Sequence, residues 1–176
     1  MDMTEGNIFL KMIVFALPIA LTTILQLFYT TVDLISVHFG DPIAGETSAA
    51  AISGNSALIN LIIVMFSEMA IGANVAIGNA IGAKNKEHAD KVMHTSLIFA
   101  LFTGIAVGIF GFTLTPLFLK LIKMDAAYIP EATLYLRIYF VGLPFLMLYN
   151  FASQIHRAIG DASTPFIALA IAGVMN

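Results

Sequence analysis

The sequence contains no cysteine and few charged residues for its length. Without cysteine, the chain forms no disulfide, offers no thiol nucleophile and cannot bind a metal through sulfur. Only 11% of its 176 residues are Asp, Glu, Lys or Arg, whereas soluble domains carry about 25%. The basic patches that bind nucleic acid are also lacking. These absences exclude a nucleic-acid partner and predict an integral membrane protein, whose natural surroundings are a lipid bilayer.

The four histidines do not have the spacing of a metal site. His88 and His94 are six residues apart, not the i, i+4 pair of a helical zinc site. His38 and His156 fall near the ends of expected spans. No nucleophile–base pair is recognisable. The sequence therefore predicts neither an enzyme nor a cofactor.

Long apolar runs make up most of the chain. A membrane-spanning helix needs about 20 apolar residues, and such runs recur between short polar turns. They predict an all-α fold, a polytopic transmembrane helix bundle with four full spans and a truncated fifth. The expected spans cover residues 8–39, 48–82, 92–119, 133–155 and 165–176. Ser163 or Thr164 is the expected N-cap of the fifth helix, with Pro165 at its first helical position.

The distribution of basic residues predicts the orientation in the cytoplasmic membrane. Five basic residues are expected on the side of the N-terminus and three on the other side, which puts the N-terminus in the cytoplasm. The five are Lys11, Lys84, Lys86, Lys91 and Arg157, and the three are Lys120, Lys123 and Arg137. The first residues are not typical of a cleaved signal peptide, because acids precede the first lysine and the following apolar run is too long.

Asp33 is the strongest candidate for a functional residue. It lies in an otherwise apolar span, where an embedded charge costs roughly 2.5–3.5 kcal/mol and faces a cavity or a partner. Gln26, Tyr29 and Thr30 share its helix face through i+3 and i+4 steps. Pro18 removes a backbone hydrogen bond and can bend the same helix. Asp33 is thus expected to take up a proton or an ion, the alternative being a hydrated position near the outer interface.

Other polar residues in the spans admit several interpretations. Glu68 could titrate, could pair with a polar neighbour inside the bundle, or could extend toward the membrane surface. Asn74 belongs to a polar line on the second span, a pattern more typical of interhelical hydrogen bonding than of a substrate path. Asn150 and Gln154 could line a drug-binding cavity, although an ordinary helix interface would use the same residues.

Small residues in the third span predict a close helix contact. Gly104 and Gly108 are separated by three residues, and Gly111 follows on nearly the same face. Such spacing lets the backbones of two helices approach closely in lipid.

Several segments together resemble the multidrug and toxic compound extrusion (MATE) family. The spacing from Pro18 to Asp33, the GANV…IGAKN stretch and the RAIGD…TP turn are specific when taken jointly. The matching segments are ALPIALTTILQLFYTTVDLISVHFG (16–40), IGANVAIGNAIGAKNKEHA (71–89), YLRIYFVGLPFLMLYNFASQIHRAIGDASTP (135–165) and the terminal IALAIAGVMN.

The resemblance implies about twelve helices in two six-helix lobes, of which this chain would be most of the N-terminal lobe. The missing C-terminal lobe would then be its partner. Members of the family export cationic and amphipathic small molecules in exchange for H⁺ or Na⁺. The resemblance assigns cation coupling, including possible Na⁺ binding, to Asp33, with Pro18 at the bend. Asn176 matches an Asn of the same cation-binding cluster, whereas Glu68 departs from the family pattern.

Three other functions remain open on the sequence. A flippase for a lipid-linked precursor would belong to the same superfamily, but it would be expected to carry more basic residues in its cavity. An intramembrane enzyme would use Asp33 and Glu68 as an acid–base pair on facing helices. A structural subunit or dimerising half-transporter would be a natural product of this length.

Overall fold

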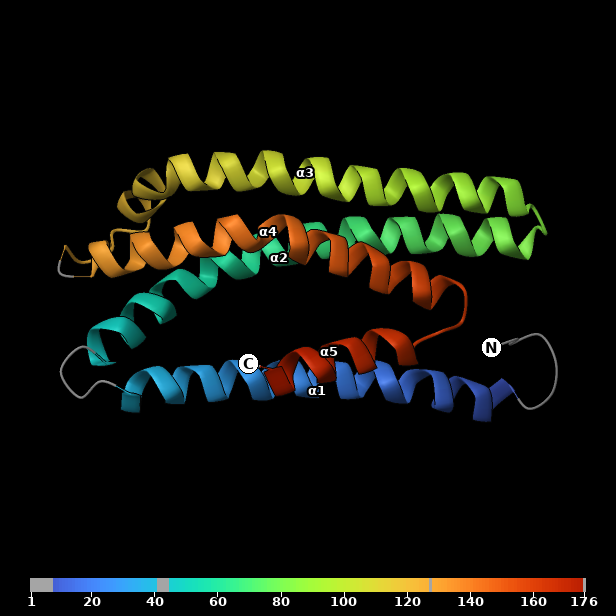
Figure 1. Cartoon of the computed structure of the whole chain (residues 1–176), viewed down its shortest axis with the longest axis horizontal. Coiled ribbons are helices and arrows are strands. Elements are labelled where there is room, and N and C mark those ends of the chain that lie inside the picture. The colour runs from blue at the N-terminus through green and yellow to red at the C-terminus, as the bar shows by residue number, and fades with distance from the viewer. Residues whose placement is uncertain (1–7, 41–44, 127, 176) are drawn as a thin grey trace. The chain divides into compact units, whose positions relative to one another are not determined.

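A computed structural model describes residues 8–40, 45–126 and 128–175, and the side chains of residues 8, 33, 34, 36–40, 45–53, 57 and 58 lie outside this description. The described residues form five α-helices and no strand (Figure 1). By length and composition, four of these helices can cross a membrane, and the fifth is shorter. The expected all-α polytopic fold is thereby confirmed. The helices are α1 (Ile8–Gly40), α2 (Gly45–Gly82), α3 (Lys86–Leu121), α4 (Ile129–Ala158) and α5 (Ser163–Met175).

Helices α3 and α4 begin four or more residues earlier than the apolar runs indicate, because polar residues favour their first turns. α3 starts at Lys86, where the Asn85 side chain accepts the backbone N–H of His88 at 3.0 Å. An Asn in this position satisfies one of the free N–H groups of a helix start. α4 starts at Ile129, inside a segment expected to be a loop, and carries Glu131 in its first turn. An acidic side chain there interacts favourably with the helix dipole.

Three helices, α2, α3 and α4, end with the same local hydrogen-bond pattern. The N–H groups of Lys84, Lys123 and Gly160 each bond the carbonyl three residues earlier, and the next N–H bonds the carbonyl five residues earlier. This Schellman motif requires a left-handed residue. The φ values are 56° for Lys84, 53° for Lys123 and 83° for Gly160. Only glycine adopts this conformation without strain, so Gly160 suits the turn that leads to α5.

The helices divide into two compact units, each described here by itself. The first unit comprises Met1–Thr31, Met69–Leu97 and Tyr149–Asn176, and the second comprises Val32–Glu68 and Ile98–Leu148. Each of the four long helices, α1 to α4, contributes to both units, because the boundary between the units falls within each of them.

In the second unit, α3 and α4 lie against each other along a line of glycines (Figure 1). A Cβ atom added to Gly104 would lie 2.7 Å from the Cα of Pro144, and one added to Gly108 would lie 2.8 Å from the backbone oxygen of Phe140. Only a residue without a side chain fits at either position. The predicted small-residue contact of the third span is therefore confirmed, with α4 as its partner.

The core of the second unit centres on one face of α4. Leu136, Phe140 and Leu143 are fully buried, and their i+4 and i+3 spacing places them on one helix face. α2 joins this core through Asn55, whose side-chain nitrogen donates to the backbone oxygen of Ala132 at 3.1 Å. An amide that bonds a neighbouring helix in this way fixes the position of α2 along α4.

Large apolar side chains are exposed on the spanning helices, including Phe9 on α1, Phe102 on α3 and Phe145 on α4. Monomeric soluble proteins rarely expose contiguous apolar surface on this scale. Lipid tails, in contrast, are as apolar as leucine and accept such surfaces. The exposed faces thus agree with the length and composition of the helices in identifying a protein of the membrane.

Candidate functional site

The first part of α1, in the first unit, contains a proline that the helix passes without ending. Pro18 has no N–H, so the carbonyl of Val14 loses its usual partner four residues on. The buried Thr22 hydroxyl donates to the backbone oxygen of Pro18 at 2.8 Å. A threonine that bonds the preceding turn slightly destabilises a helix and often bends it. The turn around Pro18 consequently lacks one of the backbone hydrogen bonds that stabilise a helix.

The predicted polar face of α1 is only partly turned toward other helices. Gln26 and Thr30 are exposed, and the Thr30 hydroxyl donates to the backbone oxygen of Gln26 at 2.9 Å. Tyr29, which shares this face, is half-buried. Of the three neighbours predicted for Asp33, Tyr29 is therefore the one held by packing.

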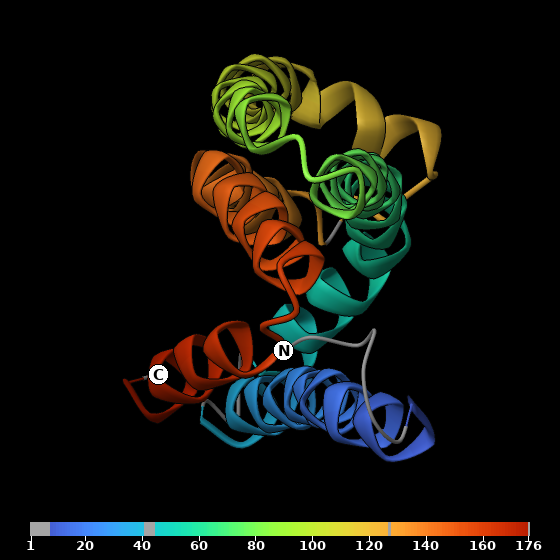
Figure 2. The same ribbon diagram turned by 90° about the vertical axis from the view of Figure 1, so that its right-hand side faces the viewer.

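Tyr29 packs directly on α5 within the first unit. A Cβ atom added to Gly173 would overlap the ring and hydroxyl of Tyr29. Figures 1 and 2 both show α5 beside the first part of α1. The absence of a side chain at Gly173 thus creates the space that the tyrosine ring occupies.

The two residues predicted to couple a cation fall outside the description. Asp33 belongs to the helical backbone of α1, but its side chain is not described, and Asn176 lies beyond the last described residue. The separation between the carboxylates of Asp33 and Glu68, which the enzyme alternative requires to be short, lies outside the description for the same reason. The cation-coupling role of Asp33 and Asn176 and the acid–base role of Asp33 and Glu68 therefore stay predictions.

The remaining predicted site residues lie on α2 and α4. Glu68 is exposed on α2. Asn150 is half-buried on α4, within the first unit. Neither position on its own assigns a function.

Asn74 and Gln154 join α2 to α4 in the first unit. The side-chain nitrogen of Asn74 donates to the backbone oxygen of Gln154 at 2.9 Å and to its side-chain oxygen at 3.2 Å. Both residues are partly buried. The interhelical bonding predicted for Asn74 is confirmed, and Gln154 is its partner rather than a residue with an unengaged side chain.

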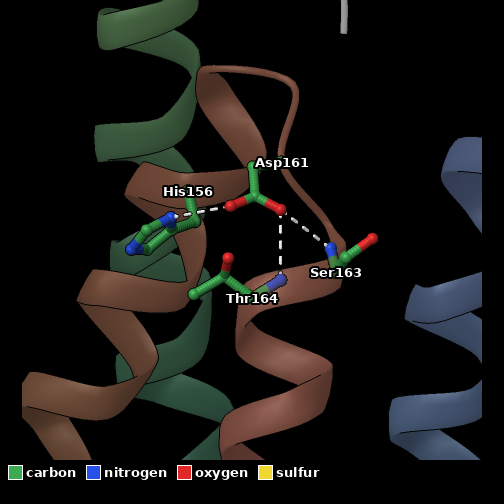
Figure 3. A network of polar contacts seen from close by, with 4 residues as sticks. All are labelled: His156, Asp161, Ser163 and Thr164. Atoms are coloured by element: carbon green, nitrogen blue, oxygen red, sulfur yellow. Dashed lines mark hydrogen bonds and ion pairs between the residues drawn. The ribbon is translucent and has the colours of Figure 1, made fainter.

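The turn between α4 and α5 is organised by Asp161 (Figure 3). One carboxylate oxygen accepts the backbone N–H groups of Ser163 at 3.0 Å and Thr164 at 3.1 Å, and the other lies 3.3 Å from Nδ1 of His156. The prediction of Ser163 or Thr164 as the N-cap is wrong, because both donate their N–H groups to the Asp161 cap. Pro165 is accordingly the third residue of α5 rather than its first.

Hydrogen bonding also makes the Asp161 carboxyl more acidic. The largest effect comes from the Thr164 hydroxyl, followed by the Thr164 N–H, with smaller effects from Ser163 and His156. These donors favour the charged form and lower the pKa of Asp161 from 3.8 to about 2. The charged cap therefore persists throughout the physiological pH range.

Sequence reasoning missed Asp161 and Gly173. The signal for Asp161 was present, since an aspartate two residues before a Ser-Thr pair is a common way to begin a helix. Gly173 carried no local signal, because its role depends on Tyr29, which lies far away in the sequence.

The helices and their apolar surfaces define the class of this chain, an all-α polytopic membrane protein. Comparison with known families then identifies the family. The model of the MatE family matches residues 18–176. The chain therefore belongs to the MatE family, the same multidrug and toxic compound extrusion family that its motifs resemble. No solved structure gives a significant match.

Curated relatives carry names that refer to drug export. The probable multidrug resistance proteins YpnP and YoeA of Bacillus subtilis are 31% and 30% identical to this chain, covering 99% and 98% of it. The multidrug export protein MepA of Staphylococcus haemolyticus is 23% identical over 94% of the chain. The matches take up 39%, 37% and 36% of these relatives, respectively. The chain thus spans less than two-fifths of the length of these relatives.

Proposed function

We propose that this chain is the N-terminal part of an exporter that moves cationic or amphipathic drugs or metabolites across the cytoplasmic membrane. The observation that carries the proposal is the family match over residues 18–176. The names of the relatives support the substrate class. Because those relatives are more than twice as long, we propose a second lobe as the partner that completes the substrate cavity. The activity is transport rather than enzymatic catalysis.

We further propose that inward flow of H⁺ or Na⁺ drives export through Asp33. A carboxylate in the membrane binds either ion: protonation neutralises it, and its oxygens are suitable ligands for a hard cation. Asn176 contributes its side-chain oxygen in this scheme. Membership of the MatE family supports the pairing, because the resemblance assigns both residues to one cation-binding cluster.

The conformational step of the proposal is bending of α1 at Pro18. The missing hydrogen bond at Pro18 supports this choice, because it makes the turn easier to deform than a regular helical turn. A bound cation can shift α1 between two conformations only through its different affinity for them. Asp33 supplies that difference, since its charge and hydrogen bonds change when the ion binds. The bend then changes the cavity and favours outward release of the drug.

The basic residues support an orientation with the N-terminus in the cytoplasm. In that orientation the turn containing Asp161 faces the cytoplasm, together with the α2–α3 turn. Asp33 is then reached from the opposite side of the membrane, where H⁺ or Na⁺ enters. This direction is the one required for exchange of an inward-moving ion for an outward-moving drug.

The test is transport by the full-length protein in vesicles with an imposed pH or sodium gradient. Asp33→Asn should abolish gradient-driven export, because an amide carries no negative charge for a proton or a cation to neutralise. Asp33→Glu should retain part of it. Glu68→Gln is the matched control, since it removes an exposed carboxylate of α2 and should leave the rate within about twofold. Normal export by Asp33→Asn, with expression equal to that of the wild type, would refute the coupling role.

A further inference from the structure

The second unit carries an apolar groove between α3 and α4 that the transport proposal does not use. Its volume is about 270 Å³. Pockets for drug-sized ligands measure about 300–1,000 Å³ and enclose most of the ligand. This groove is smaller and is lined almost entirely by apolar atoms. The lining residues on α3 are Ile105, Gly108, Ile109, Phe112 and Thr113, and those on α4 are Phe140, Val141 and Pro144.

A positively charged side chain, that of Arg137, lies beside one end of this groove. The guanidinium carbon of Arg137 is 5.0 Å from the centre of the Phe112 ring, which is a cation–π contact. Arg137 precedes Phe140, Val141 and Pro144 by three, four and seven residues, so it continues their line along α4. None of the described residues that line the groove is acidic. An apolar groove with a positive charge at its end matches an amphiphile with an anionic head group.

The arginine is incompletely satisfied by the described part of the chain. Its Nε atom is buried and has no hydrogen-bond partner there. A buried donor without a partner is unfavourable, and a charged group in a membrane helix usually pairs with something. Guanidinium groups bind phosphate particularly well because their donors match its oxygens in pairs.

The dimensions also fit a lipid of one leaflet. From Ile105 to Thr113 the groove extends about 12 Å along α3, which is less than half of the roughly 30 Å hydrocarbon core. α4 has 30 residues and is about 45 Å long. If α4 is centred in the bilayer, Arg137 lies only about 5 Å inside the hydrocarbon boundary. Its long side chain can reach a phosphate at that level.

We propose that this groove binds an anionic phospholipid, whose phosphate contacts Arg137 and whose acyl chain lies along the groove between α3 and α4. The groove binds its lipid from the membrane leaflet at the α4 N-terminal end of the bundle. The residues that line the groove do not include those proposed to couple the ion, so the proposal stands whether or not Asp33 drives export.

The test is native mass spectrometry of the delipidated full-length protein, titrated with phosphatidylglycerol or with phosphatidylcholine of the same acyl chains. The wild type should retain phosphatidylglycerol more strongly. Arg137→Gln should weaken that binding by about fivefold, the effect of roughly one basic residue at a membrane surface. It should weaken phosphatidylcholine binding less, because the choline cation offsets the charge of the phosphate. Arg157→Gln is the matched control, because it removes a second α4 arginine whose Nε is likewise buried and unpaired.

A second pair of variants tests the groove without touching the charge. Ile109→Trp fills the groove from an exposed position, whereas Ile98→Trp adds the same bulk at an exposed position of α3 outside the groove. Only Ile109→Trp should reduce phosphatidylglycerol retention. Equal retention by Arg137→Gln and wild type, or equal losses in Arg137→Gln and Arg157→Gln, would overturn the proposal. A dimer mass that Ile109→Trp abolishes would identify a second copy as the occupant and would also overturn it.

Discussion

Replacing Gly108 by alanine tests the close contact between α3 and α4. The added Cβ would lie 2.8 Å from the backbone oxygen of Phe140, a separation below any ordinary carbon–oxygen contact. A flexible side chain could move away, but a backbone carbonyl inside α4 cannot do so alone. The two helices must therefore separate locally, and the packing along their shared face must loosen.

The expected magnitude follows from two opposing effects. Overfilling a well-packed site costs about 1–3 kcal/mol, whereas replacing glycine by alanine within a helix gains about 0.5–1 kcal/mol. The Gly142→Ala variant separates the two effects, because Gly142 also lies in a helix of the second unit, and no atom of the described residues lies within 4 Å of its added Cβ. The helix-forming gain is common to both variants. Their stabilities should thus differ by about 1–3 kcal/mol, with Gly108→Ala the less stable.

The assay is reversible unfolding of the full-length protein by sodium dodecyl sulfate in mixed micelles, followed by circular dichroism. Gly142→Ala should equal or exceed the wild type in free energy of unfolding, and Gly108→Ala should fall below both. If the two alanine variants unfold at the same detergent fraction, the α3–α4 contact does not have the geometry described here.

Three further predictions concern the first unit. The pKa of the Asp161 carboxyl is about 2 in the folded protein, below the ordinary 3.8, so the charged cap is fully present above about pH 4 and is lost as pH falls through 2. The protection factors for hydrogen exchange at the start of α5, which correct for the intrinsic pH dependence of amide exchange, should therefore fall in that range, and in Asp161→Ala they should be low already at pH 7. Asn74→Ala and Gln154→Ala should show a coupling of about 0.6 kcal/mol in a double-mutant cycle, and strict additivity would contradict the side-chain bond. Gly173→Ala should lower the melting temperature and Tyr29→Ala should restore it in the double variant, whereas no rescue would argue against their contact.

The sequence was sufficient for the fold because the hydrophobic effect acts on long segments. Each spanning helix contains an apolar run that exceeds the thickness of a bilayer, so its existence does not depend on any one residue. The starts of α3 and α4 depend instead on single local features, the Asn85 cap and the polar first turn that includes Glu131. An estimate based on average hydrophobicity over a span does not detect such features, and both helices consequently begin earlier than predicted.

The candidate site was predictable only where its contacts follow from chemistry rather than geometry. An amide such as Asn74 in an apolar helix must find a hydrogen-bond partner, so interhelical bonding could be expected. Its partner, Gln154, could not be identified, because that choice depends on how α2 is aligned with α4. Tyr29 was selected for its place near Asp33, but its packing on Gly173 depends on the position of α5, which no sequence periodicity specifies.

The turn before α5 explains how that position is fixed. Gly160 ends α4 in a left-handed conformation, and the next residue, Asp161, begins α5 by accepting its first N–H groups. From Asp161 to Gly173 the helix rises about 18 Å, and each residue rotates it by about 100°. If α5 started one residue later, Val174 would replace Gly173 against Tyr29, and its branched side chain could not fit where a single Cβ already overlaps the ring. The short polar turn therefore determines which α5 residue contacts α1.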